Sequence, residues 1–230
     1  MSLLLLGGAT IVLVDVDVGL RQQELDDVAV AMHLQMQDHY GPIWGPRISV
    51  RAAITGEPLK PTDWKHSLVS KPTLDGALAY HDRNKFGVPT LFTFVKLAEQ
   101  LGQSWTAAAS HENLEAGTDP GLHATVELPD GRIASVEICD QVEQDTYKVG
   151  AIELSNFNTP ENFTPPADLT AVTFDYLGLS KTAFETRPGG YCQIYDPAKG
   201  WTQEGQMSRY RAALRHEGIS RGARRVRLSL

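Results

Sequence analysis

The segment His111-Glu112-Asn113-Leu114-Glu115 holds the side chains whose types and spacing are best suited to chemistry. Residues four apart lie on one face of an α-helix, so His111 and Glu115 can reach one metal ion. Glu112 is offset by about 100° and can approach a water molecule beside that ion. We therefore predict a metal site in which His111 and Glu115 are ligands and Glu112 is the general base.

The same spacing underlies the H-E-x-x-H motif of metalloproteases, with Glu115 here in the place of the second histidine. A carboxylate oxygen ligates zinc well, but it also makes the site harder, so manganese and calcium compete with zinc. The alternative interpretation is a plain surface helix, or a histidine that is hydrogen-bonded in the core.

Two other segments offer partners for this helix. The acidic run from Glu137 to Glu143 ends an expected strand, and Asp140 and Glu143 are candidates for the third ligand. The alternative for these acids is a solvated loop. His81 also ends an expected strand, where it can steady the developing oxyanion or be held by Asp82.

Hydrophobic periodicity indicates the elements that position these residues. Strands are expected over residues 9–16 and 47–54, with a helix over 21–39 between them. The prolines of 55–65 indicate a loop, and the apolar runs 74–80 and 90–95 indicate a strand pair. The motif helix should run from Ser104 to about residue 116, and Gly117 and Pro120 should weaken its end. A hairpin over 124–138, strands over 147–154 and 191–195, and an irregular stretch over 155–190 complete the expected α+β fold with a mixed sheet.

Composition predicts a globular protein of one domain over residues 1–206, followed by a tail over 207–230. Cys139 and Cys192 do not form a disulfide framework, and we expect reduced thiols in a cytoplasmic or virion setting. The apolar start is interrupted by Gly7-Gly8 and ended by Asp15, so we expect neither a signal peptide nor a membrane span.

The end of the chain is basic, whereas the chain as a whole carries a net charge of −7. Residues 208–230 hold seven arginines against one acid, Glu217. Such a tail favours an acidic surface or a nucleic acid as partner, with contacts through Arg221, Arg224, Arg225 and Arg227. The alternative is a solvated end.

Several short motifs in a fixed order resemble a family of uncharacterised actinobacterial and bacteriophage proteins that have a zincin-like Ser-His-Glu-x-Leu-Glu pattern followed by Asp-Pro. The matching residues are 76–82, Ser110–Glu115, Asp119-Pro120, 137–143, 149–150, 155–157, 174–178 and 188–191. The resemblance implies a zincin-like metallopeptidase fold. Asn113, Ala116 and Gly117 depart from it, because the family usually has apolar residues there. The departure predicts a more polar helix with a looser end, and it favours a degenerate or repurposed site.

Two functions follow as hypotheses. The first is a metal-dependent hydrolase that acts on a peptide or protein. The second is a virion structural protein, such as a decoration, neck or tail component, that assembles with other virion proteins or with copies of itself and keeps the fold without catalysis. A soluble DNA-binding protein is a weaker third, because the chain up to the tail is acidic.

Overall fold

The computed structural model describes residues 8–74, 76–128 and 130–205. The chain divides into two compact units. The first unit takes in the described residues up to Thr73, together with Leu78–Gly121 and Thr146–Ser155; the second takes in Leu74–Ala77, Leu122–Asp145 and the described residues from Asn156 onward. The predicted tail lies outside the described residues. The fold is mixed α+β, as expected from the sequence.

The first unit is built on a five-stranded sheet in the order β2-β1-β3-β5-β4. Strands β1 (Thr10–Asp15), β2 (Ser49–Ala52), β3 (Trp64–Val69) and β5 (Pro89–Phe94) are parallel, and the edge strand β4 (Ala79–Arg83) is antiparallel to β5. The expected strand pair is thus present, although its first strand begins at Ala79 rather than at Leu74. Strand β3 was not predicted.

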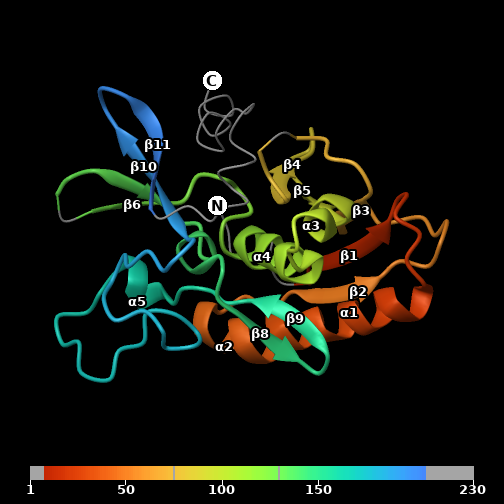
Figure 1. Ribbon diagram of the computed structural model, residues 1–230, viewed down its shortest axis with the longest axis horizontal. Helices are drawn as coiled ribbons and strands as arrows, with labels where there is room; N and C mark the ends of the chain where they lie inside the picture. Colours follow the sequence, from red (N-terminus) through yellow and green to blue (C-terminus); the bar gives the residue numbers. More distant parts are fainter. Residues whose placement is uncertain (1–7, 75, 129, 206–230) are drawn as a thin grey trace. The chain divides into compact units, whose positions relative to one another are not determined.

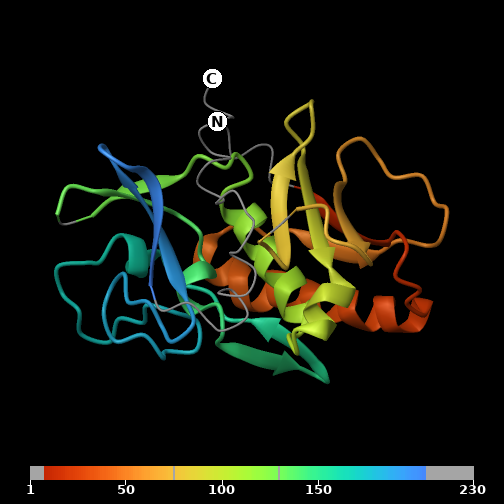
Figure 2. The same ribbon diagram turned by 45° about the horizontal axis from the view of Figure 1, so that its top comes forward.

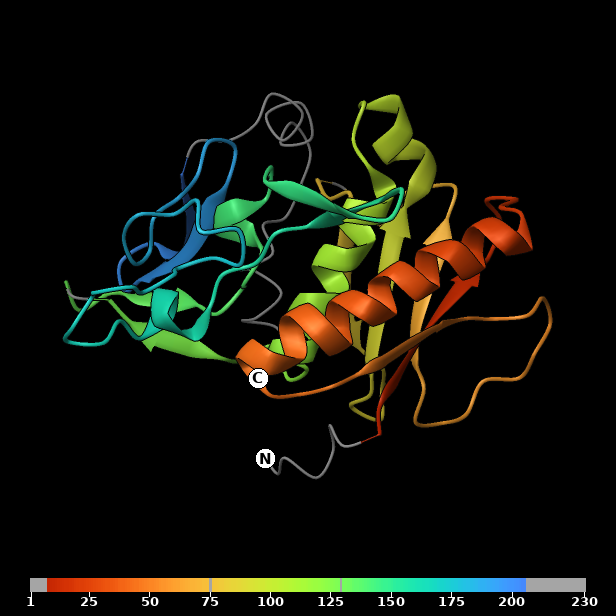
Figure 3. The ribbon, with the colours of Figure 1, turned by 90° about the horizontal axis from the view of Figure 1, so that it is seen from below.

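Two long helices pack on the strands of this sheet (Figures 1 and 3). Helix α1 (Gln22–Leu34) packs on β2 and continues as the π-helical turn η2 (Gln35–Tyr40) and the short helix α2 (Gly41–Trp44). Helix α4 (Trp105–Thr118) follows the short helix α3 (Val95–Gln100) and packs on β4 and β5. The motif helix was therefore predicted correctly. No helix in the described part of the chain is long and apolar enough to cross a membrane.

Helix α4 is better ordered at its end than the sequence led us to expect. Residues 109–117 are all buried, and the helix continues to Thr118, whose hydroxyl donates to the Leu114 carbonyl at 3.0 Å. A Cβ atom on Gly117 would lie 3.1 Å from Met36 Cε and 3.2 Å from the Tyr40 hydroxyl. Gly117 therefore permits close packing of α4 against η2. The prediction of a looser end was wrong.

A small hairpin of β8 (Thr146–Val149) and β9 (Ile152–Ser155) belongs to the first unit and takes the place of the single strand predicted there (Figure 2). Gly150 adopts a φ of 61° in its turn. The hairpin is tied to α4, because the Ser155 amide donates to Ser110 Oγ at 2.8 Å. The Ser110 hydroxyl in turn donates to the Ala107 carbonyl at 3.0 Å.

The second unit has a four-stranded antiparallel sheet in the order β11-β10-β7-β6. The strands are β6 (Thr125–Glu127), β7 (Ile133–Ser135), β10 (Tyr191–Asp196) and β11 (Gly200–Gly205), and the last of them was not predicted. Leu128, Ala134, Cys192 and Ile194 form its buried apolar cluster. Both cysteines are free, as expected, and both are buried. Burial raises the pKa of the Cys192 thiol to about 12.

Residues 156–190 are mostly irregular, as predicted, apart from the short helix α5 (Pro160–Phe163). Buried side-chain hydrogen bonds take the place of ladder bonds here. Gln141 Oε1 accepts from the amides of Asn158 and Asn162, each at 2.5 Å. Asp175 accepts from Asn156 Nδ2 at 2.8 Å and from the Ser180 amide. Burial opposes ionisation of Asp175, but these donors outweigh it and lower its pKa.

Gly190 in the second unit should tolerate no side chain. A Cβ atom there would overlap the backbone carbonyl of Gln141, which cannot move without disturbing the short 3-10 helix η3 (Asp140–Val142). We expect Gly190→Ala to lower the free energy of unfolding by about 3 kcal/mol. Gly131→Ala is the matched control, because its φ of 83° costs about 1 kcal/mol while its Cβ meets nothing. Urea unfolding followed by circular dichroism measures both, and equal losses would contradict the overlap.

Candidate metal centre

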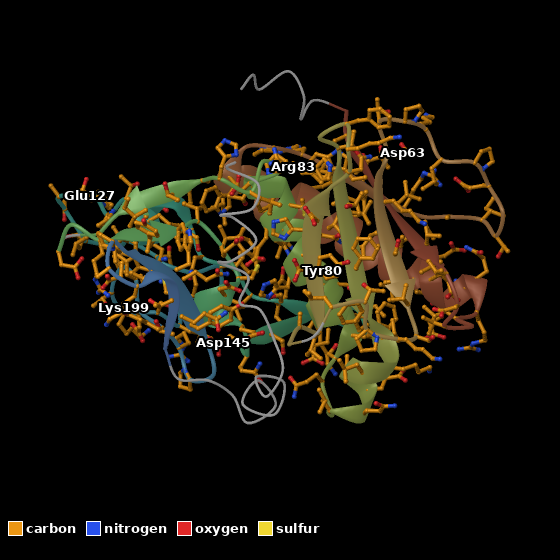
Figure 4. The ribbon with its side chains drawn as sticks, turned by 90° about the horizontal axis from the view of Figure 1, so that it is seen from above. Asp63, Tyr80, Arg83, Glu127, Asp145 and Lys199 are labelled. Atoms are coloured by element: carbon orange, nitrogen blue, oxygen red, sulfur yellow. The ribbon has the colours of Figure 1, made fainter. Side chains whose placement is uncertain are left out.

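The candidate site lies within the first unit and is carried by α4 and the edge strand β4. Ser104 caps the helix, because its hydroxyl accepts from the Ala107 amide at 3.2 Å. Three alanines follow and favour the helix. Strand β4 presents His81 on the same sheet face as its β5 partner Leu91. Figure 4 labels Tyr80 and Arg83 on this strand, on either side of His81 in sequence.

The predicted pair on α4 does converge. His111 Nε2 lies 3.0 Å from Glu115 Oε1, and the side chains are one helical turn apart. His111 is 5% exposed and Glu115 is fully buried. An imidazole nitrogen and a carboxylate oxygen at this separation are suited to one divalent ion, because two zinc ligands at about 2.1 Å are at most about 4.2 Å apart.

Glu112 and His81 form the second contact of the site. His81 Nδ1 lies 2.8 Å from Glu112 Oε2, which is a hydrogen-bond distance, and 3.9 Å from Glu115 Oε2, which is not. Glu112 is 1% exposed and His81 is 8% exposed. Glu115 thus lies between two histidines, with one oxygen toward His111 and the other toward His81.

The chemistry of this donor set fits a metal ion. Ligand atoms of His81, Glu112 and Glu115 all lie within 4.8 Å of one another. Isolated carboxylates are costly to bury, so two buried glutamates in one small volume need positive charge nearby. A divalent cation or protonated histidines can provide it. Buried histidine and glutamate groups in the described residues can therefore hold a metal ion, whose type the donors leave open.

The other predicted site residues lie in the second unit. Asp140 begins η3 and is 1% exposed, and Glu143 follows η3 and is partly buried. Gln193 Nε2 lies 3.5 Å from Asp140 Oδ2 within that unit. Their role as third ligand stays a prediction. Arg221, Arg224, Arg225 and Arg227 lie outside the described residues, so contacts of the tail with nucleic acid or protein also stay predictions.

Sequence reasoning missed His66, which lies on β3 beneath α4. Its Nδ1 is 2.8 Å from Asn113 Oδ1, and its Nε2 is 2.8 Å from Thr93 Oγ1. Burial lowers the pKa of His66 to about 4, although the bond to Asn113 and the charge of Glu112 oppose this shift. The ring is therefore neutral at pH 7. A signal existed, since Trp64, His66 and Leu68 alternate with Lys65 and Ser67 as in a strand.

No family model, curated protein or solved structure matches this chain.

Proposed function

We propose that this protein is a metal-dependent hydrolase with a zincin-like arrangement, and that its substrate is a peptide or protein. One observation carries the proposal. The side chains of His111 and Glu115 meet at 3.0 Å on one face of α4, while the neighbouring Glu112 is held separately by His81 at 2.8 Å. Ligands and base are thus divided between adjacent residues, as the hydrolytic motif requires.

His111 and Glu115 would hold the ion. A bound divalent ion would polarise the scissile carbonyl and acidify water. Glu112 accepts a proton from the attacking water at a carboxylate oxygen and later gives it to the leaving amine. His81 orients the Glu112 carboxylate through their hydrogen bond. This is a different role from the oxyanion contact that the sequence suggested for His81.

The zincin-like part of the proposal is supported by the order of elements in the first unit. Helix α4 follows a mixed sheet, packs on β5 and on the antiparallel edge strand β4, and receives His81 from that edge strand. The choice of a peptide or protein as the proposed substrate is based on the family that the sequence resembles.

Hydrolysis of a quenched fluorescent peptide library tests the proposal. We expect cleavage by the zinc- or manganese-loaded protein, loss of cleavage after dialysis against a chelator, and its return when the ion is added back. Protein that binds the ion but cleaves nothing in the library or in denatured casein would contradict the hydrolase. It would leave the non-catalytic structural protein as the better account.

A further inference from the structure

The central part of the sheet holds a second histidine in register with the one at the site. His66 of β3 and His81 of β4 both pair with Leu91 of the strand between them, β5. They therefore lie in one row on one face, about 10 Å apart across two strand spacings. Each is hydrogen-bonded to α4, His81 to Glu112 and His66 to Asn113, the next residue along the helix.

Each hydrogen bond around His66 has a defined donor and acceptor. Asn113 Oδ1 can only accept, so the proton of the neutral ring is on Nδ1. Nε2 then accepts from the Thr93 hydroxyl. The other end of the Asn113 amide donates to Met32 Sδ of α1 at 3.3 Å. Asn113, His66 and Thr93 are each fully buried. Each acceptor thus has its donor without competition from solvent.

The hydrogen bonds from Asn113 leave α4 at a different angle around the helix from the site residues. Asn113 is about 160° around the helix from Glu115 and about 100° from Glu112. A helix that packs only through apolar groups can rotate by small amounts at low cost, whereas a hydrogen bond loses strength quickly when its angle changes. A bond at Asn113 therefore restricts the directions in which the carboxylates of Glu112 and Glu115 face.

We infer that His66 is a positioning residue for the metal site, which acts by fixing the rotation of α4 through Asn113. The inference rests on the proposed function and deepens it. It also assigns a purpose to the polar residue at position 113, where the resembling family is usually apolar. The polar pair does not weaken the packing of the helix; it specifies one rotation of it.

A double replacement separates positioning from plain stability. Asn113→Leu alone leaves the His66 Nδ1–H group buried without an acceptor, so we expect lower stability and weaker binding of Co²⁺ by about 10- to 100-fold. His66→Phe with Asn113→Leu removes donor and acceptor together, so the thermal midpoint should return toward that of the wild type. Because no hydrogen bond then fixes the rotation, Co²⁺ binding should stay weak and its visible absorption spectrum should stay altered.

A milder pair covers the case in which those variants do not fold. Thr93→Val removes only the donor to His66 Nε2, and Thr90→Val makes the same change on β5 at a position facing the other side of the sheet. We expect Thr93→Val to weaken Co²⁺ binding about threefold and Thr90→Val to leave it unchanged.

If the wild-type protein binds Co²⁺ and the folded double variant binds it with the same affinity and spectrum, His66 has no positioning role and the proposed function stands. Should the double variant not fold, equal binding by Thr93→Val and Thr90→Val overturns the inference. If the wild-type protein binds no Co²⁺ at all, the proposed function fails together with it.

Discussion

Replacing Glu112 with glutamine should stop hydrolysis while leaving the metal in place. The amide has the size of the carboxylate and can still contact His81, but it cannot accept a proton from water. Loss of a general base lowers the catalytic rate about 100- to 10,000-fold. We expect a fall of this size in kcat, measured with a peptide cleaved by the wild-type protein, and the same metal content per chain.

The matched control is Glu99→Gln in α3, an exposed glutamate that pairs only with Lys96 among the ion pairs of the described residues. It should change neither kcat nor metal content. Loss of the metal from Glu112→Gln would contradict our division of roles. It would indicate instead that the ion is held by His81, Glu112 and Glu115, whose ligand atoms are also close enough to share one.

The second large effect that we expect is a loss of folding stability at acid pH, caused by the buried His66. Its pKa is about 4 in the folded protein, against 6.5 for an ordinary histidine. The unfolded chain therefore binds a proton at His66 below about pH 6.5, whereas the folded chain resists it down to about pH 4. Stability from this residue is complete above pH 6.5 and falls as the pH is lowered. A difference of about 2.5 in pKa corresponds to about 3 kcal/mol over this range.

Urea unfolding of metal-free protein at about pH 7 and about pH 4 measures this loss. Other groups titrate over the same range, so the informative quantity is the difference between the wild type and the double variant His66→Phe with Asn113→Leu. The double variant should lose about 3 kcal/mol less than the wild type. Equal losses would mean that His66 is protonated as easily in the folded protein as in the unfolded one.

The local features of the site could be predicted from the sequence because they depend on neighbours along the chain. Ser104 and the alanines that follow specify the start of α4, and the spacing of His111 and Glu115 brings them together on any regular helix. The strand that carries His81 was expected, but the contact of His81 with Glu112 was not. That contact joins residues 31 positions apart and depends on how α4 packs on β4.

The features that were missed depend on distant partners. Strand β3 was hidden because a histidine, a lysine and a serine interrupt its apolar pattern, and His66 is compatible with burial only because Asn113 and Thr93 complete its hydrogen bonds. Asn113 in turn suggested a loosely packed helix when read alone. In the structure Asn113 is buried and bonded to His66, so the helix is well packed at this position. No local sequence pattern shows this contact.

Metal content is the most direct test of the central claim, that His111 and Glu115 hold one divalent ion. Elemental analysis should be made on wild-type protein purified without chelator, and on His111→Ala, Glu115→Ala and the control His123→Ala, which removes an exposed histidine outside the site. We expect about one zinc or manganese ion per chain in the wild type and in the control, and none in the two site variants. A folded wild-type protein that carries no metal and cannot be loaded with zinc, manganese or calcium would contradict the account.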